Sequence, residues 1–192
     1  MNRPNFFFYT KLVLAFVCVA FAAQIAVALA DPQFDGHINQ IAPVFGVALG
    51  IVWIGGLRYL PAIFCGALIP GLLVEHDLLA ILSVPLATVA SATLSLWLVR
   101  FLQLRIDLAH IRDTLLLIFC AMLIGTLTGS MIEAVFLCAG GTIIWEEFSA
   151  LFFTDWLAAA VGSIIVTPFI LSWSDKHGFQ LGIRQLLEVA GW

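Results

Sequence analysis

Acidic side chains inside apolar sequence are the residues here whose chemistry most needs an explanation. Glu133 lies within a long apolar run, and Asp155 and Trp156 stand at the start of the last one. An ionisable group at membrane depth is costly, and a carboxylate there is suited to binding a cationic ligand or relaying a proton. We therefore take Glu133, Asp155 and Trp156 as candidates for a ligand or signal site.

A structural role is the alternative for Glu133. The residue lies near one end of its apolar run, so its side chain would reach the membrane interface, or would form a hydrogen bond with Ser130 or Thr128 in the same run. Either arrangement would satisfy the carboxyl group without any ligand.

The histidines fall in the polar segments between the apolar runs. His37 and His76 lie among carboxylates, where they would sense pH or a divalent cation, and His110 and His177 lie in the basic segments. Solvated loop histidines are the simpler explanation, and we predict no metal site.

No catalytic motif is present. The sequence has no His-Glu-x-x-His, no Gly-x-Ser-x-Gly and no phosphate-binding glycine loop. The cysteines have no metal-ligand spacing and are expected to be small buried hydrophobes: Cys18, Cys65, Cys120 and Cys138. We expect no catalytic residues, no cofactor and no enzymatic activity.

The elements that position these residues follow from composition. Of the 192 residues, 62% are hydrophobic and 10% are charged, and the mean hydropathy is +1.10. A soluble domain is far less apolar, and no basic face for nucleic acid exists. Because a helix needs about 20 apolar residues to cross a bilayer and the runs lack strand-like alternation, we predict an all-α transmembrane bundle whose partner is the lipid bilayer.

Six apolar runs predict six spans. The second and third are short, since sixteen residues reach roughly 24 Å. A Gly55-Gly56 turn separates them, and we predict two spans and not a re-entrant hairpin, because a hairpin would place Arg58 at membrane depth. The predicted spans are about 12–30, 41–56, 60–74, 78–99, 114–138 and 156–173, with 140–154 as an interfacial connection.

The basic residues test this count. With six spans, all eight fall on one side: Arg3, Lys11, Arg58, Arg100, Arg105, Arg112, Lys176 and Arg184. By the positive-inside rule that side is cytoplasmic, and both termini lie there. A cleaved signal peptide ending at Ala28-Leu29-Ala30 is an alternative for the first run, which is longer than usual for that role. Glycine spacings at Gly46/Gly50 and Gly125/Gly129 predict close helix packing.

Two stretches resemble the MASE1 family, an integral membrane sensory domain of bacterial signalling proteins. The first runs from Pro43 through Gly46 and the glycine turn to Arg58, Pro61 and Gly66. The second is Trp156-Leu157-Ala158-Ala159-Ala160-Val161-Gly162, followed by Val166-Thr167-Pro168. The motif positions are therefore Pro43, Gly46, Arg58, Pro61, Gly66, Gly162 and Pro168, and they anchor about residues 10–175.

The chain also departs from that family. A Trp-Pro-Pro-Ser-Gly-like entry is replaced by Ala42-Pro43-Val44-Phe45-Gly46, and Ala159 stands where the family has an acidic residue. Asp155 lies one helical turn earlier and is a candidate replacement. By the resemblance, we expect residues 1–175 to form a transmembrane sensory domain that is short at its C-terminus, and 176–192 to be a cytoplasmic tail or a link to a missing region.

The resemblance implies a sensor of a bacterial inner membrane that passes a signal to a cytoplasmic partner, either a histidine kinase or a diguanylate cyclase module, or to a membrane protein partner. A homodimer stays open. Two alternatives remain: a substrate-binding membrane subunit of a vitamin-type transporter, which needs a polar-lined pocket, and a membrane scaffold subunit that packs against a partner through its glycine faces.

Overall fold

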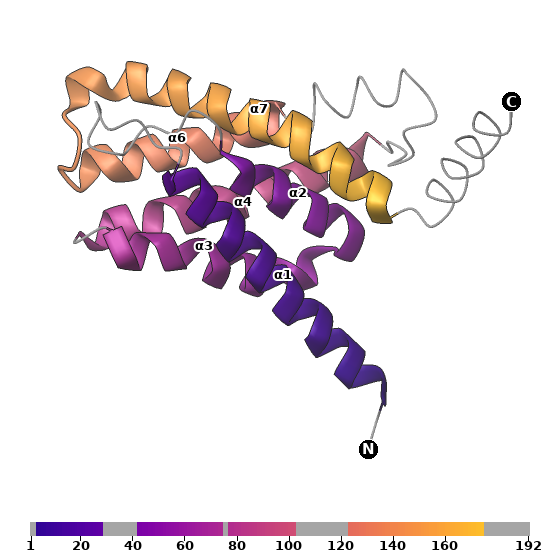
Figure 1. Cartoon of the computed structure of the whole chain (residues 1–192). Coiled ribbons are helices and arrows are strands. Elements are labelled where there is room, and N and C mark those ends of the chain that lie inside the picture. The colour runs from indigo at the N-terminus through magenta and orange to yellow at the C-terminus, as the bar shows by residue number, and fades with distance from the viewer. Residues whose placement is uncertain (1–2, 29–41, 75–76, 103–122, 175–192) are drawn as a thin grey trace, which may run out of the picture.

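A computed structural model describes residues 3–28, 42–74, 77–102 and 123–174, in which every element is a helix and no strand is present. The six α-helices lie side by side as a bundle (Figure 1). They are α1 (Arg3–Ala28), α2 (Pro43–Gly55), α3 (Leu60–Val74), α4 (Leu78–Phe101), α6 (Ile124–Ala139) and α7 (Phe148–Ser174), with short 3₁₀ turns η2 (Leu57–Tyr59) and η4 (Trp145–Glu147). The predicted all-α bundle is confirmed for these residues.

Local sequence explains where several helices begin and end. Pro43 is the first residue of α2, a position where its missing N–H costs nothing. Gly56 ends the helix with a φ of 76°, which favours glycine, and η2 and α3 follow at once. Asp77 caps α4 by accepting hydrogen bonds from the backbone N–H groups of Leu79 and Ala80, at 3.1 and 3.3 Å.

Glycines set the closest helix contacts. On α2, Gly46 packs against Gly162 of α7 and Gly50 packs against Ile170, so α2 and α7 run parallel. On α6, Gly125 meets Ser95 of α4, and Gly129 meets Ala87 and Ser91. That order makes α4 and α6 antiparallel. Both predicted glycine faces are therefore used within this chain, where small residues let backbones approach closely.

The remaining helices close the bundle around one main core. Gly66 of α3 packs on the backbone of α1 at Phe16, and Gly71 packs on the backbone of α4 at Ile81. Buried side chains from α1, α2, α3, α4 and α7 form that core, and the largest fully buried ones are Phe45, Leu49, Ile63, Val19 and Val52.

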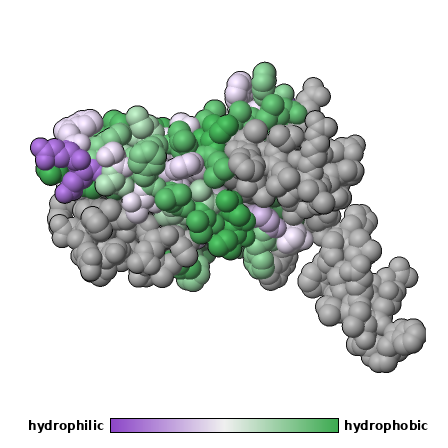
Figure 2. Space-filling model, turned by 90° about the horizontal axis from the view of Figure 1, so that it is seen from above, coloured by the Kyte–Doolittle hydropathy of each residue, from purple (hydrophilic) through white to green (hydrophobic). Residues whose placement is uncertain are grey.

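The outer surface is apolar over the length of the helices. Figure 2 shows hydrophobic residues over the side of the bundle and hydrophilic ones gathered at one end. Large exposed side chains include Phe21, Leu73, Trp97, Phe101, Ile165 and Phe169. Within the described residues, Leu78–Phe101 and Trp145–Ser172 are long and apolar enough to cross a membrane, and four shorter apolar helices accompany them. Such a surface suits lipid and not water.

Several predictions of local structure need correction or go untested. The segment 140–154 is not wholly a connection, because α7 begins at Phe148 and no proline or glycine follows in the helix before Gly162. Cys18 and Cys65 are exposed on the apolar surface, and only Cys138 of the described cysteines is buried. Cys120, all four histidines, the first part of the predicted span 114–138 and the segment 176–192 lie outside the described residues.

Candidate functional site

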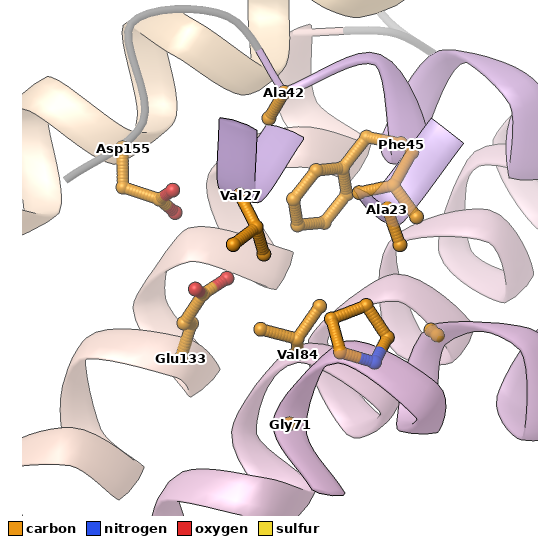
Figure 3. Close-up of a pocket in the computed structure, with 11 residues that line it drawn as sticks. Ala23, Val27, Ala42, Phe45, Gly71, Val84, Glu133 and Asp155 are labelled. Atoms are coloured by element: carbon orange, nitrogen blue, oxygen red, sulfur yellow. The ribbon is translucent and has the colours of Figure 1, made fainter. Parts of the chain in front are cut away.

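Glu133 and Asp155 meet inside the bundle. Glu133 stands on α6, about one and a half turns before the helix ends, and Asp155 stands two turns into α7. The side chains are only 6% and 3% exposed. Figure 3 shows both carboxyl groups directed into the same space from neighbouring helices. The sequence named both as candidates, and the structure brings them together.

The two carboxyl groups lack sufficient partners. One oxygen of each, Oε2 of Glu133 and Oδ2 of Asp155, is buried without a hydrogen bond. The two groups are close enough for their charges to interact. The Ser130 hydroxyl lies beside Asp155, but its geometry falls short of a hydrogen bond and its oxygen is likewise unpartnered. Buried polar atoms are normally satisfied, so this cluster is a functional candidate.

The space between the carboxyl groups is a small cavity of about 50 Å³. All six described α-helices and the residue before α2 supply its walls, and apart from the two acids the lining is apolar (Figure 3). The lining residues are Ala23, Val27, Ala42, Val44, Phe45, Ala67, Pro70, Gly71, Val84, Glu133 and Asp155.

The structural role expected for Glu133 is not what the structure contains. Its side chain does not reach the bundle surface. Thr128 donates instead to the Ile124 carbonyl at 3.1 Å, and Ser130 lies next to Asp155. Thr128 is therefore engaged elsewhere, whereas Ser130, three residues before Glu133 and on the same side of α6, lies beside Asp155 with its oxygen unpartnered.

Trp156 does not line the cavity. Its ring is half-buried, and its indole N–H donates to the Leu123 carbonyl at 3.2 Å. Leu123 directly precedes α6, so this hydrogen bond ties α7 to the start of its neighbour. The structure thus places Trp156 as a link between the two helices that carry Glu133 and Asp155.

A tightly packed seam between α2 and α7 adjoins the cavity. The Ala42 N–H donates to the Ala158 carbonyl at 3.2 Å, and the Thr167 hydroxyl donates to the Gly46 carbonyl at 3.0 Å. Between these bonds, Gly46 faces Gly162 at backbone contact. We call this contact, formed by Ala42, Gly46, Ala158, Gly162 and Thr167, the α2–α7 seam.

Comparison with known proteins gives this seam a context. The family model named MASE1 matches residues 11–189. The chain belongs to the MASE1 family. No curated protein and no solved structure matches it. The predicted resemblance is confirmed, and it extends past the expected limit at residue 175 into the segment predicted to be a tail. MASE1 domains are membrane-associated sensory domains, so this chain is a membrane protein with a sensory role.

The MASE1 motif positions are mostly structural in this chain. Pro43, Gly46 and Gly162 build the seam or its entrance, and Pro168 follows the Thr167 that bonds across it. Gly66 allows α3 to contact α1. The others lie at the surface, with Arg58 in η2 and Pro61 in the first turn of α3. The two stretches on which the resemblance rests therefore pack against each other through α2 and α7.

The departure at Ala159 also has a structural counterpart. Ala159 is fully buried in the main core, whereas Asp155, one turn earlier, faces the cavity. The expected replacement lies on the buried side of α7, as the one-turn spacing predicts.

Sequence reasoning missed the apolar contributors to the site. Phe45 and Val84 are ordinary core-type residues, and only the folded bundle brings them to the carboxyl groups. Phe45 was weakly signalled, because it lies inside the first stretch that resembles the family, and Val84 was not signalled at all. Within the described residues, no group of three or more His, Cys, Asp or Glu side chains is arranged to hold a metal ion.

Proposed function

We propose that this chain is a six-span sensory domain of a bacterial inner membrane, with both termini cytoplasmic, and that it acts without catalysis. The carboxyl pair Glu133–Asp155 receives the signal, and α7 carries it to a cytoplasmic output. That output is a histidine kinase or diguanylate cyclase module, or a membrane protein partner.

The observation that carries this proposal is the position of the pair beside the α2–α7 seam. Asp155 belongs to α7 itself, and the cavity is also lined by Ala42, Val44 and Phe45 at the start of α2. An occupant that moves Asp155 would therefore act on both sides of the seam. From Asp155, α7 continues to Ser174, about 29 Å further along the axis.

The direction of transmission follows from charge. The Arg100 guanidinium lies next to Gly56, so the exposed Arg58 of η2 and the end of α4 are neighbours. The start of α1 and the end of α7 lie at the same end of the bundle (Figure 1). Basic residues mark the cytoplasmic side, so the carboxyl pair belongs to the outer half and α7 ends inside.

The mechanism is a shift between two helix packings. Gly46 and Gly162 hold α2 and α7 in backbone contact. A shift of α7 along or around its axis would break the Thr167 hydrogen bond to Gly46 and move the cytoplasmic end of the helix. Packed helices switch between discrete arrangements more readily than they deform continuously. To move the population substantially, an occupant must favour one packing by a few kcal/mol.

The transporter alternative has less support. Pockets for drug-sized ligands have volumes of roughly 300–1,000 Å³, and the cavity here is about 50 Å³. A vitamin would require a much larger site. The scaffold alternative relied on free glycine faces, and Gly46, Gly50, Gly125 and Gly129 all pack against helices of this chain.

Distance measurement between spin labels tests the proposal. Labels replace Leu57 and Ser172, exposed residues near the expected cytoplasmic end, in a variant without other cysteines and reconstituted in lipid bilayers. We expect Glu133→Gln and Asp155→Asn each to shift the distance distribution. Glu146→Gln and Glu147→Gln, which alter exposed acids of η4, are matched controls that leave it unchanged. Identical distributions in all five proteins would refute the proposed path.

A further inference from the structure

Three unpartnered oxygens converge where α6 and α7 meet. Oε2 of Glu133 and Oδ2 of Asp155 have no hydrogen bond, and neither has the Ser130 Oγ beside Asp155. All three residues are more than nine-tenths buried. The two carboxyl groups point into the cavity (Figure 3). These buried oxygens can accept hydrogen bonds but have no donor, and a ligand that carries donors would supply the missing hydrogen bonds.

The missing partner should be positively charged. In the part of the chain that the structure describes, no basic side chain lines the cavity or forms an ion pair with either acid. Arg100, which lies next to Gly56, and the exposed Arg58 of η2 do not line the cavity. A buried carboxylate is stabilised when a cation with matching hydrogen bonds approaches it.

The rest of the lining favours an organic cation over a metal ion. Ca²⁺ takes about 6–8 oxygen ligands and Mg²⁺ requires a near-octahedral set, whereas the walls beyond the acids are Val27, Phe45, Pro70, Val84 and smaller apolar residues. A primary ammonium group has three N–H donors, which matches the three free oxygens. An attached alkyl group would contact the apolar walls, and the Phe45 ring would attract the charge.

We propose that this cavity binds the head of a small protonated primary amine, with the ammonium held by Glu133, Asp155 and Ser130 and the carbon chain against Val27, Phe45 and Val84. A cavity of about 50 Å³ accommodates a short alkylammonium and not a bulky one. This assignment rests on the proposed function, because it names the ligand class of the same site.

The experiment measures binding to the purified full-length chain in detergent, by thermal unfolding at constant ionic strength. The probes are methylammonium, ethylammonium and butylammonium chloride, compared with sodium, potassium, calcium and tetramethylammonium chloride. We expect saturable stabilisation by the primary amines alone. Equal stabilisation by sodium or calcium would overturn the proposal in favour of a metal ion, and equal stabilisation by tetramethylammonium would overturn the role of the N–H donors.

Variants locate the binding. Glu133→Gln and Asp155→Asn should each weaken the apparent affinity roughly tenfold or more, and Ser130→Ala by a smaller factor. Glu146→Gln and Glu147→Gln, which change exposed acids, should leave affinity unaltered. Unaltered affinity in the three site variants would overturn the proposal. If one variant fails to fold, the other two and the cation selectivity of the unmodified chain still decide it.

The two proposals fail separately. If amines do not bind but Glu133→Gln still shifts the label distance between Leu57 and Ser172, the signalling path stands and the ligand class is wrong. If butylammonium binds and Asp155→Asn weakens that binding, but the label distance never changes, the site stands and the signalling path is wrong.

Discussion

Gly46 of α2 and Gly162 of α7 face each other so closely that neither position has room for a side chain. A Cβ at Gly46 would lie 2.6 Å from the Gly162 carbonyl oxygen, and a Cβ at Gly162 would overlap the Ala42 carbonyl. The parallel pair is thus held at backbone contact next to the carboxyl cavity. In lipid, where no hydrophobic effect drives helices together, such contact is a principal source of cohesion.

Adding one methyl group at this contact should separate the helices. We expect Gly162→Ala to lower the free energy of unfolding by about 1–3 kcal/mol, because the obstacle is backbone and cannot rotate away. Denaturant unfolding in detergent micelles measures it. Ala150→Met adds volume at an exposed position of α7 and serves as control. Equal stability of both variants would contradict the packing described here.

The hydrogen bond across the seam makes a second prediction. Thr167→Val keeps the shape of the side chain but removes the donor to Gly46, and should cost roughly 0.5–2 kcal/mol, within the range of interhelical hydrogen bonds in membranes. Thr167→Ser should retain most of the stability. Thr154→Val is the control, since Thr154 bonds within its own helix, to the Ala150 carbonyl. A loss as large in the control would show that the interhelical bond is not the cause.

Trp156 should act on α6 and not on the cavity. Trp156→Phe removes the indole donor to Leu123, so we expect faster amide hydrogen exchange in the first turn of α6, with amine affinity changed less than by Asp155→Asn. Trp145→Phe alters an exposed ring near the start of α7 and is the comparison. Weaker amine binding in Trp156→Phe than in Asp155→Asn would instead show that Trp156 contacts the ligand.

The capping of α4 is open to a simple test. Asp77→Ala removes the acceptor for the Leu79 and Ala80 N–H groups and should destabilise the chain by about 0.5–2 kcal/mol. Asp77→Asn keeps an acceptor and should lose much less. Thermal unfolding of the three proteins decides between a cap and a merely solvated acid, for which both variants would behave alike.

The helices could be predicted from the sequence because apolar runs, prolines and glycines mark them directly. Pro43 begins α2, Gly56 ends it, and the expected close contacts at Gly46 and Gly125 are present. The start of α7 was missed because Glu146 and Glu147 suggested an interfacial loop, although no proline or glycine separates them from Asp155.

The site was predicted only in part: the two acids were named from the sequence, and the apolar walls were not. Glu133 and Asp155 are conspicuous because carboxylates are rare in apolar runs. Their meeting depends on the register of α6 against α7, which single-chain spacing does not specify. The walls from α1, α3 and α4 are less predictable still, since residues such as Val84 differ in no visible way from other core residues.

The last prediction concerns the coupling of the two acids. If Glu133 and Asp155 hold one ammonium group together, removing either leaves the other with an incomplete site, so the second substitution should cost less than the first. The double variant Glu133→Gln/Asp155→Asn should therefore bind butylammonium only slightly more weakly than either single variant, since residues sharing one partner are not additive. A titration of all four proteins completes the cycle. Additive losses would mean that the two acids act on separate occupants, against their convergence on one cavity.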